Sequence, residues 1–144
     1  MQIDTSINVQ RRPEDVVRFV ADVRNDPRWH TDILEARSST DEVTVGTVFD
    51  IKVEPAMGVS EGTMKVSRLE PDLVEFEGHM GKMAPRVRMR AVADGTGARV
   101  TRIVELEPPG AMRLMGPMIK RKIAKDNERF LANLKRVLEE QLAG

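Results

Sequence analysis

Cysteine and tyrosine are both absent from this chain of 144 residues. The lack of cysteine excludes disulfides, thiol nucleophiles and thiolate metal ligands, and it suits a protein of the reducing cytoplasm, where we expect this one to reside. The lack of tyrosine excludes any chemistry that relies on a phenol hydroxyl. Aromatic residues make up only 3% of the sequence, so bulky rings can fill only part of a large interior.

The chain also lacks net charge and long apolar runs. Lys plus Arg and Asp plus Glu both number 23, so the overall field favours neither nucleic acid nor an acidic partner. No segment approaches the roughly 18 apolar residues of a membrane-spanning helix. The first residues show no basic region followed by an apolar run, so we expect no signal peptide and no stable membrane insertion. The length predicts a single domain over residues 1–144.

Short segments of alternating hydrophobicity fill most of the chain. Ile3, Thr5, Ile7 and Val9 alternate as in a strand with one buried face. Six more strand candidates follow at residues 33–40, 46–54, 60–69, 73–79, 86–93 and 99–107. Because the connections between them are short, the spacing indicates an antiparallel meander rather than a parallel sheet with crossover helices.

Helical patterns lie after the first strand and at the end of the chain. Pro13 fits the first turn of a helix with apolar residues at helical spacing. Asn25-Asp26-Pro27 is expected to break that helix, and a short second one to begin at Arg28-Trp29-His30. Residues 111–142 then form a long amphipathic pattern. A curved sheet closed by one such helix tends to enclose a pocket.

Three local sequences accompany this order of elements: Asn25-Asp26-Pro27-Arg28-Trp29, the Asp94-Gly-Thr-Gly97 hairpin with the strand after it, and Glu107-Pro-Pro-Gly110. Together they resemble the START-like (SRPBCC) superfamily, in particular its polyketide cyclase/dehydrase and lipid-transport group. The resemblance implies an α+β helix-grip fold, in which a seven-stranded antiparallel sheet wraps around a long C-terminal helix, with two short helices after the first strand. Members bind lipids, polyketides or other apolar molecules, and only some are enzymes.

Methionine is abundant, and every methionine after the initiator lies between residues 57 and 118. In a meander, alternate turns fall at the same end of the sheet, so six of these residues collect around one rim: Met57, Met80, Met83, Met112, Met115 and Met118. Methionine suits surfaces that accept varied apolar shapes. We interpret the rim as a pliable entrance for a hydrophobic ligand; the alternative is that these residues fill core space or are simply exposed.

The expected pocket lies between the sheet and the terminal helix. Inward strand positions carry small apolar residues, which leaves room for a cavity of roughly 300–1,000 Å³, unless dense packing closes it. Asn127 interrupts the apolar stripe of the helix and either orients a ligand or satisfies a buried group or water. Trp29 either lines the pocket or anchors the short helix to the sheet. The expected ligand-binding residues are Trp29, Met57, Met64, Phe76, Met80, Met83, Met89, Met115, Ile119, Ile123 and Asn127.

Catalytic candidates are few and weak. His79 closes a strand near the rim, where it is either a general acid or base or a partly exposed strand-end residue. His30 is expected to be structural. The last strand has an ambiguous face: if Arg102 points inward it suits a carboxylate or enolate, and if Glu105 points inward it suits a base. The alternative is that the charge faces solvent or pairs with the neighbouring strand.

No nucleophile elbow, phosphate loop, dinucleotide fingerprint or zinc motif is present, so we expect neither a metal nor a cofactor. Basic residues early in the last helix, Lys120, Arg121, Lys122 and Lys125, either guide anionic lipid heads or dock on a membrane surface, or they form a solvated face. The leading hypothesis is binding of a small lipid or polyketide-like ligand. The alternatives are a polyketide cyclase or dehydratase in the same cavity, which would have to work without tyrosine, and a protein-interaction module. The oligomeric state stays open.

Overall fold

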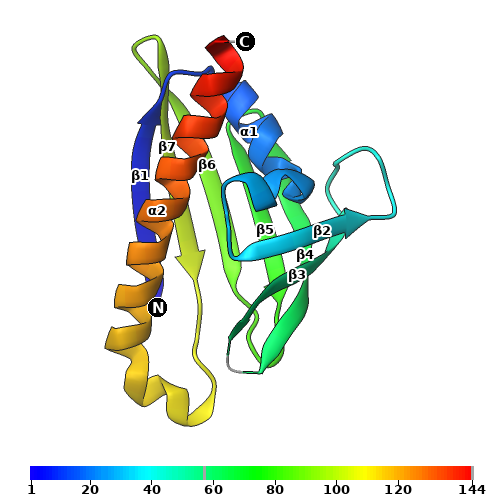
Figure 1. Ribbon diagram of the computed structural model, residues 1–144, viewed down its shortest axis with the longest axis vertical. Coiled ribbons are helices and arrows are strands. Elements are labelled where there is room, and N and C mark those ends of the chain that lie inside the picture. The colour runs from blue at the N-terminus through cyan, green and yellow to red at the C-terminus, as the bar shows by residue number, and fades with distance from the viewer. Residues whose placement is uncertain (57, 144) are drawn as a thin grey trace.

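The computed structural model of the protein describes residues 1–56 and 58–143, with side chains up to residue 140. In this part of the chain seven strands form one antiparallel sheet in the order β1-β7-β6-β5-β4-β3-β2 (Figure 1). Their bounds are β1 Gln2–Val9, β2 Ile33–Ser38, β3 Val48–Ala56, β4 Val59–Glu70, β5 Leu73–His79, β6 Arg86–Asp94 and β7 Gly97–Glu105. The predicted meander is confirmed.

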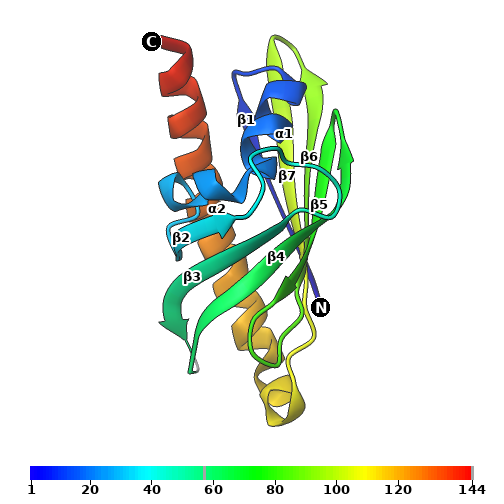
Figure 2. The ribbon, with the colours of Figure 1, turned by 90° about the vertical axis from the view of Figure 1, so that its right-hand side faces the viewer.

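The long helix α2 (Gly116–Ala143) packs against β1 and runs along the length of the curved sheet (Figures 1 and 2). This is the helix-grip arrangement that the sequence predicted. Residues 111–115, however, do not belong to the α-helix, because Gly110–Met115 forms a separate 3₁₀ helix, η2. Pro117 has no backbone N–H to donate to the preceding turn, so the α-helix begins at Gly116 with the proline in its first turn.

Two short helices follow β1. Helix α1 (Pro13–Ala21) begins with its proline and carries Glu14 and Asp15 in the first turn, as the sequence predicted. The expected break at Asn25-Asp26-Pro27 is wrong, because this segment is itself a 3₁₀ helix, η1 (Val23–Arg28). The Asp22 carboxylate accepts a hydrogen bond from the Arg24 backbone N–H at 3.1 Å, which caps the turn. The helix therefore ends where a new one was expected to begin.

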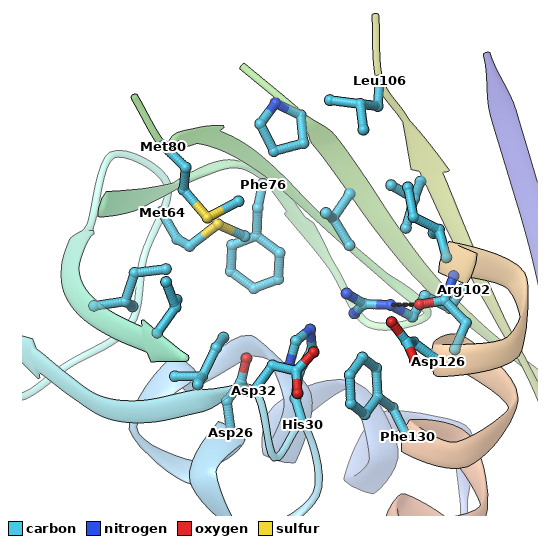
Figure 3. A pocket seen from close by; sticks show the side chains of 18 of the residues that line it. Asp26, His30, Asp32, Met64, Phe76, Met80, Arg102, Leu106, Asp126 and Phe130 are labelled. Atoms are coloured by element: carbon cyan, nitrogen blue, oxygen red, sulfur yellow. Dashed lines mark hydrogen bonds between the residues drawn. The ribbon is translucent and has the colours of Figure 1, made fainter. Parts of the chain in front are cut away.

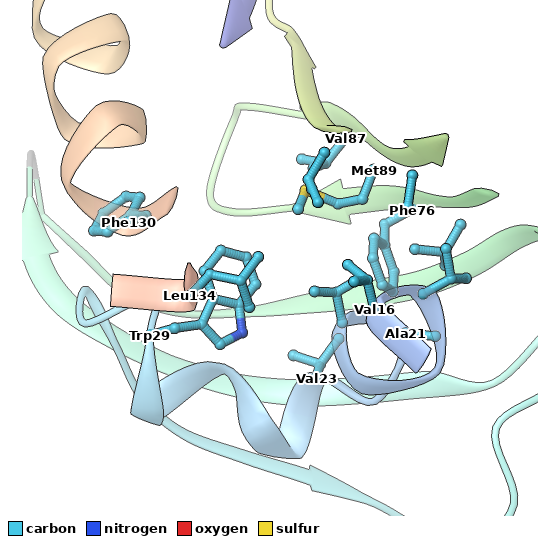
Figure 4. Close-up of a cluster of buried hydrophobic side chains, with 14 of the residues drawn as sticks. Val16, Ala21, Val23, Trp29, Phe76, Val87, Met89, Phe130 and Leu134 are labelled. Carbon is cyan, nitrogen blue, oxygen red and sulfur yellow. The ribbon is translucent and has the colours of Figure 1, made fainter. Parts of the chain in front are cut away.

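The core consists mainly of small and branched apolar side chains. Trp29, which follows η1, is 1% exposed and lies beside Leu134 of α2 (Figure 4). Removing such side chains from water contributes about 1.5–3 kcal/mol each. Helix α2 supplies the apolar stripe Phe130, Leu131, Leu134 and Leu138. Trp29 thus packs the η1 segment against α2, whereas the anchor expected from the sequence was between the short helix and the sheet.

Gly97 holds β1 close to β7. A Cβ atom at this position would lie 2.3 Å from the carbonyl oxygen of Val9, closer than any real contact. Only glycine permits this approach, and the approach brings Val9 opposite Ala98 in the β1–β7 ladder. The glycine of the predicted hairpin therefore sets the position of β1, against which α2 packs.

Candidate functional site

A cavity of about 270 Å³ lies between the sheet, η1 and α2 (Figure 3). It falls just below the roughly 300–1,000 Å³ range of small-molecule sites. Its walls come from segments distant in the sequence, since β3 to β7 contribute side chains together with the η1 region and the middle of α2. The sheet and the helix therefore leave space between them, as the sequence predicted, but less than a full-sized ligand site.

One side of the cavity is apolar and the other is polar. Figure 3 shows Met64, Met80 and Phe76 grouped on one side, with Arg102 and Asp126 on the other. The apolar lining is completed by Val20, Trp29, Ile33, Ile51, Val53, Ala56, Val59, Met83, Pro85, Val87, Met89, Val104, Leu106, Ile123 and Phe130. The other polar lining residues are Asp26, His30, Asp32, Glu54 and Asn127. Such a division suits an amphipathic guest.

Arg102 is the central polar residue of the site. The β7 side chains Val100, Arg102 and Val104 are all buried, which resolves the ambiguous face of the last strand in favour of the arginine. Its Nε donates a hydrogen bond to Asn127 Oδ1 at 3.2 Å. Its Nη1 contacts Met89 Sδ at 3.7 Å. The guanidinium is thereby fixed by one residue of α2 and one of the neighbouring strand.

Burial lowers the pKa of Arg102 to about 10, and the negative charge of Asp26 opposes part of this decrease. A group with this pKa is still charged at neutral pH. The guanidinium carbon also lies 5.7 Å from the centre of the Trp29 ring, a favourable cation–π distance. The cavity therefore contains a fixed positive charge that is only 8% exposed.

Asp26, from η1, is buried near this charge. Burial raises the pKa of the Asp26 carboxyl well above its usual 3.8, because desolvation outweighs the opposing effect of Arg102. The nearby Trp29 indole also favours the charged form, but the two side chains do not meet in hydrogen-bond geometry. Asp26 is consequently a carboxyl that takes up a proton far more readily than an exposed one.

His30 completes the polar side. Its ring stacks on Phe130 of α2 with centroids 4.0 Å apart and planes at 19°, and it meets the Trp29 ring edge-on at 5.7 Å. Desolvation, followed by the charge of Arg102, lowers the pKa of the imidazole well below 6.5. His30 is therefore neutral at physiological pH, with one ring nitrogen able to accept a hydrogen bond.

Four buried polar atoms of the lining have no hydrogen-bond partner among the described residues. They are Asp26 Oδ1, Trp29 Nε1, His30 Nδ1 and Asn127 Nδ2. Buried polar groups are nearly always paired in native proteins. All four belong to residues that line one cavity, but the atoms themselves are enclosed by protein, and the Asp26 carboxyl and the Trp29 indole lie near each other.

Most of the predicted site residues line this cavity. The structure brings together Trp29, Met64, Phe76, Met80, Met83, Met89, Arg102, Ile123 and Asn127. Met115 is 50% exposed on η2 and Ile119 is half-buried at the start of α2, and neither lies in the lining. Met57 lies outside the described residues.

Two catalytic candidates are placed elsewhere. His79 is exposed, because strand alternation sets it on the face opposite Phe76. Glu105 is half-buried on the outer face of β7, opposite the face that carries Arg102. The methionine rim is also incomplete: Met80 and Met83 line the cavity, whereas Met112, Met115 and Met118 do not. Of the rim methionines that the structure describes, the two in the β5–β6 connection are the ones that contact the pocket.

The sequence interpretation missed Asp26 and His30 as site residues. Asp26 was assigned to a helix break, and His30 to a structural role. Assigning Val23–Arg28 as a helix would have kept Asp26 within an element rather than at a break. Trp29 and His30 lie beyond the end of that helix, and no local pattern predicts His30 in the lining.

No helix among the described residues combines the length and apolar character that crossing a bilayer requires. They contain no group of three or more His, Asp or Glu side chains arranged to hold a metal ion.

Solved structures show the same fold across nearly the whole chain. A START superfamily protein from Mycobacterium smegmatis superposes with a TM-score of 0.76 at 17% identity, covering 97% of this chain and 98% of that one. TTHA0849 from Thermus thermophilus gives 0.78 at 15% identity, covering 94% and 95%. StfQ, a di-domain ARO/CYC of the steffimycin biosynthetic pathway, gives 0.76 at 13% identity, covering 99% of this chain and 52% of StfQ.

These likenesses define the fold class as START-like. The family model for polyketide cyclase / dehydrase and lipid transport matches residues 1–139, and the chain therefore belongs to that family. No curated protein shows significant similarity to the sequence. Family and fold support a role in hydrophobic ligand binding or cyclisation.

Proposed function

We propose that this protein binds a small, mainly apolar molecule that carries one electron-rich oxygen group, such as a carbonyl, carboxylate or enolate. The observation that carries the proposal is a buried, charged guanidinium on the polar side of the cavity, opposite an apolar side that includes Met64, Met80 and Phe76 (Figure 3). The oxygen group would accept hydrogen bonds from the Arg102 guanidinium. The hydrocarbon part would lie against Met64, Phe76 and the other apolar residues.

The size of the cavity narrows the ligand class. A volume of about 270 Å³ lies below that of typical drug-sized sites. It favours a short acyl chain or a molecule of one or two rings over a sterol or a long-chain lipid. Flexible methionines at positions 64, 80, 83 and 89 allow the walls to adapt to different shapes.

The two parts of the ligand would contribute differently to affinity. Apolar burial supplies about 25 cal/mol per Å² before the costs of association. A charge-assisted hydrogen bond to the guanidinium adds about 1.5–3 kcal/mol, equivalent to roughly a tenfold to hundredfold preference for the oxygenated ligand. We therefore expect the apolar part to set the overall affinity and Arg102 to set the selectivity.

Matched ligands and matched variants test this assignment. Naphthalene and 2-naphthoate differ only in the carboxylate, and calorimetry or fluorescence titration would compare their affinities. We expect Arg102→Met to remove most of the preference for 2-naphthoate while leaving naphthalene binding within a few-fold. Arg99→Met is the control, because Arg99 is exposed on the same strand. Equal loss for both compounds, or an equal effect of the control, would argue against Arg102 as the recognition group.

A second candidate function is a polyketide cyclase or dehydratase acting in the same cavity. One observation favours it: a neutral imidazole, a readily protonated carboxyl and a cationic guanidinium surround the cavity together, in His30, Asp26 and Arg102. His30 would remove or return a proton, and Arg102 would stabilise the resulting enolate. His79 and Glu105 take no part in this version.

A measurement of turnover distinguishes the enzyme hypothesis from the ligand-binding hypothesis. A poly-β-keto thioester analogue would be incubated with wild-type protein, His30→Gln and His79→Gln, and the products followed by mass spectrometry. An enzyme would lose most of its turnover with His30→Gln, retain it with His79→Gln, and bind the analogue in both cases. Binding without conversion in the wild type would exclude cyclisation of that substrate class.

A further inference from the structure

The segment from Pro108 to Lys125, called here the basic tip, differs in charge from the rest of the molecule. It contains Arg113, Lys120, Arg121, Lys122 and Lys125 and no acidic residue, although the chain as a whole has a net charge of zero. It comprises the end of the segment that connects β7 to η2, all of η2 and the first turns of α2. Positive charge is therefore concentrated at one end of the protein.

The basic tip also exposes large apolar side chains. Leu114 is 88% exposed, Met118 68% and Met115 50%, and η2 has no buried residue. Single exposed apolar residues are ordinary on protein surfaces. Three of them within five consecutive residues form a patch, and such patches mark contact with another molecule or with a membrane.

These residues lie at a projecting end of the molecule. Figures 1 and 2 show η2 and the start of α2 at the end of the molecule opposite the C-terminus, on the side where the β5–β6 connection also turns. On α2, Met118, Lys122 and Lys125 are spaced i, i+4 and i+7 and therefore share one helix face. The apolar side chains and the positive charges thus occupy the same surface.

Most of the positive charge has no acidic partner in the described part of the chain. Lys122 pairs with Asp126 at 2.7 Å. The charge of Arg113 helps to lower the pKa of Glu107. The Glu107 carboxylate also pairs with the N-terminal amino group at 2.6 Å. Among the described residues Lys120, Arg121 and Lys125 form no ion pair within 4.0 Å, and all three are exposed. These three charges are therefore available to bind an anionic surface.

From this combination we propose that the basic tip docks the protein on an anionic lipid surface. Leu114, Met115 and Met118 would enter the boundary between head groups and acyl chains, while Lys120, Arg121 and Lys125 contact the lipid phosphates. A protein partner fits the shape less well, because a stable interface needs about 800 Å² on each side and this is a narrow projection. Binding to a nucleic acid backbone would leave the exposed leucine and methionine side chains of the basic tip without an apolar surface to contact.

Docking by this end would also bring the β5–β6 part of the cavity lining, Met80 and Met83, close to the lipid. A short amphipathic ligand would then exchange between membrane and cavity with little exposure to water. The docking itself depends only on the basic tip, so it stands or falls independently of the ligand proposed above.

Sedimentation with lipid vesicles tests the proposal directly. The probes are vesicles of phosphatidylcholine alone and of phosphatidylcholine mixed with phosphatidylglycerol, each at low salt and at about 0.5 M salt, where surface charges are screened. We expect wild-type protein to bind the mixed vesicles at low salt, to bind the neutral ones weakly, and to be released by salt. Lack of binding to mixed vesicles, or equal binding to both kinds, would overturn the proposal.

Two sets of variants locate the contact. Lys120→Gln/Arg121→Gln/Lys125→Gln should weaken binding by on the order of a hundredfold, since each basic residue near an anionic surface contributes about 1 kcal/mol. Leu114→Ser/Met118→Ser should weaken it by at least tenfold while retaining its salt dependence. All five positions are exposed, so the variants should fold, as circular dichroism would verify.

The matched controls lie on other surfaces. Arg68→Gln/Arg90→Gln/Arg99→Gln removes the same charge from the sheet, and Val45→Ser/Val92→Ser removes exposed apolar residues elsewhere. Both controls should bind mixed vesicles within about twofold of the wild type. If the controls weaken binding as much as the tip variants, the attraction is diffuse and the basic tip is not a docking surface.

Discussion

Arg102 on β7 and Asn127 on α2 are joined by a hydrogen bond of 3.2 Å between Nε and Oδ1, and both residues are buried. This bond connects the sheet to the helix on the polar side of the cavity. It also leaves the Asn127 amide nitrogen without a partner among the described residues. The same contact therefore links the sheet to the helix and fixes both side chains in the lining of the cavity.

A double-mutant cycle measures this connection. Arg102→Met and Asn127→Leu should each lower the free energy of unfolding, because each leaves the other polar group buried without its partner. The double variant should be destabilised less than the sum of the two, with a coupling of about 1–3 kcal/mol by urea unfolding. Arg99→Met, exposed on the same strand, should change stability by less than about 0.5 kcal/mol. Strict additivity would show that the hydrogen bond adds nothing to stability.

Asp26 predicts a distinctive dependence of stability on pH. Its folded-state pKa is raised above 3.8 by burial, so the folded protein holds this proton more tightly than the unfolded chain. The contribution of Asp26 to the free energy of unfolding is complete below about pH 3.8, and it is lost as the pH rises through the folded-state pKa. The difference in unfolding free energy between wild type and Asp26→Asn should therefore shift against the wild type as the pH rises above about 3.8.

Other carboxylates titrate in the same range, but they are present in both proteins and cancel in that difference. A difference that stays constant over the whole range would mean that Asp26 titrates like an exposed carboxyl. Urea unfolding at closely spaced pH values gives the required curve.

His30 predicts the opposite sign. Its folded-state pKa lies well below 6.5, so only the unfolded chain takes up this proton as the pH falls. The stabilising effect is complete above pH 6.5 and is lost below it, with a slope of up to about 1.4 kcal/mol per pH unit. His30→Gln should be less sensitive than wild type between about pH 6.5 and 5. If both proteins lose stability in parallel there, the imidazole is not kept neutral by burial.

The sequence predicted the architecture well because sheet periodicity is local information. Alternation and short turns located all seven strands to within two residues and gave their antiparallel order. The inward face of β7 was not predictable from its own residues, because both faces carry a charged side chain. It is decided by register: Arg102 lies opposite Met89 on β6 and bonds to Asn127 of α2, and neither relation can be read from the strand alone.

The site was predicted in part for the same reason. Residues on strands and on α2, such as Phe76 and Asn127, follow from periodicity and reach the cavity. Strict alternation from Phe76 would also have set His79 on the opposite face. Asp26 and His30 depend on a short 3₁₀ helix, where an Asn-Asp-Pro sequence is equally compatible with a break. Their roles emerge only from burial and from stacking on a distant helix.

The central claim is that the cavity admits a small oxygenated apolar guest. The most direct test compares ligand binding by wild type, by a variant that fills the cavity and by a matched surface variant. Octanoate and 2-naphthoate would be titrated into wild type, Val87→Phe and Val92→Phe. Val87 lines the cavity, whereas Val92 on the same strand is 53% exposed. We predict saturable one-to-one binding of at least one of the two ligands in wild type and Val92→Phe, reduced at least tenfold in Val87→Phe. No saturable binding to the wild type, or binding that Val87→Phe leaves unchanged, would contradict the account.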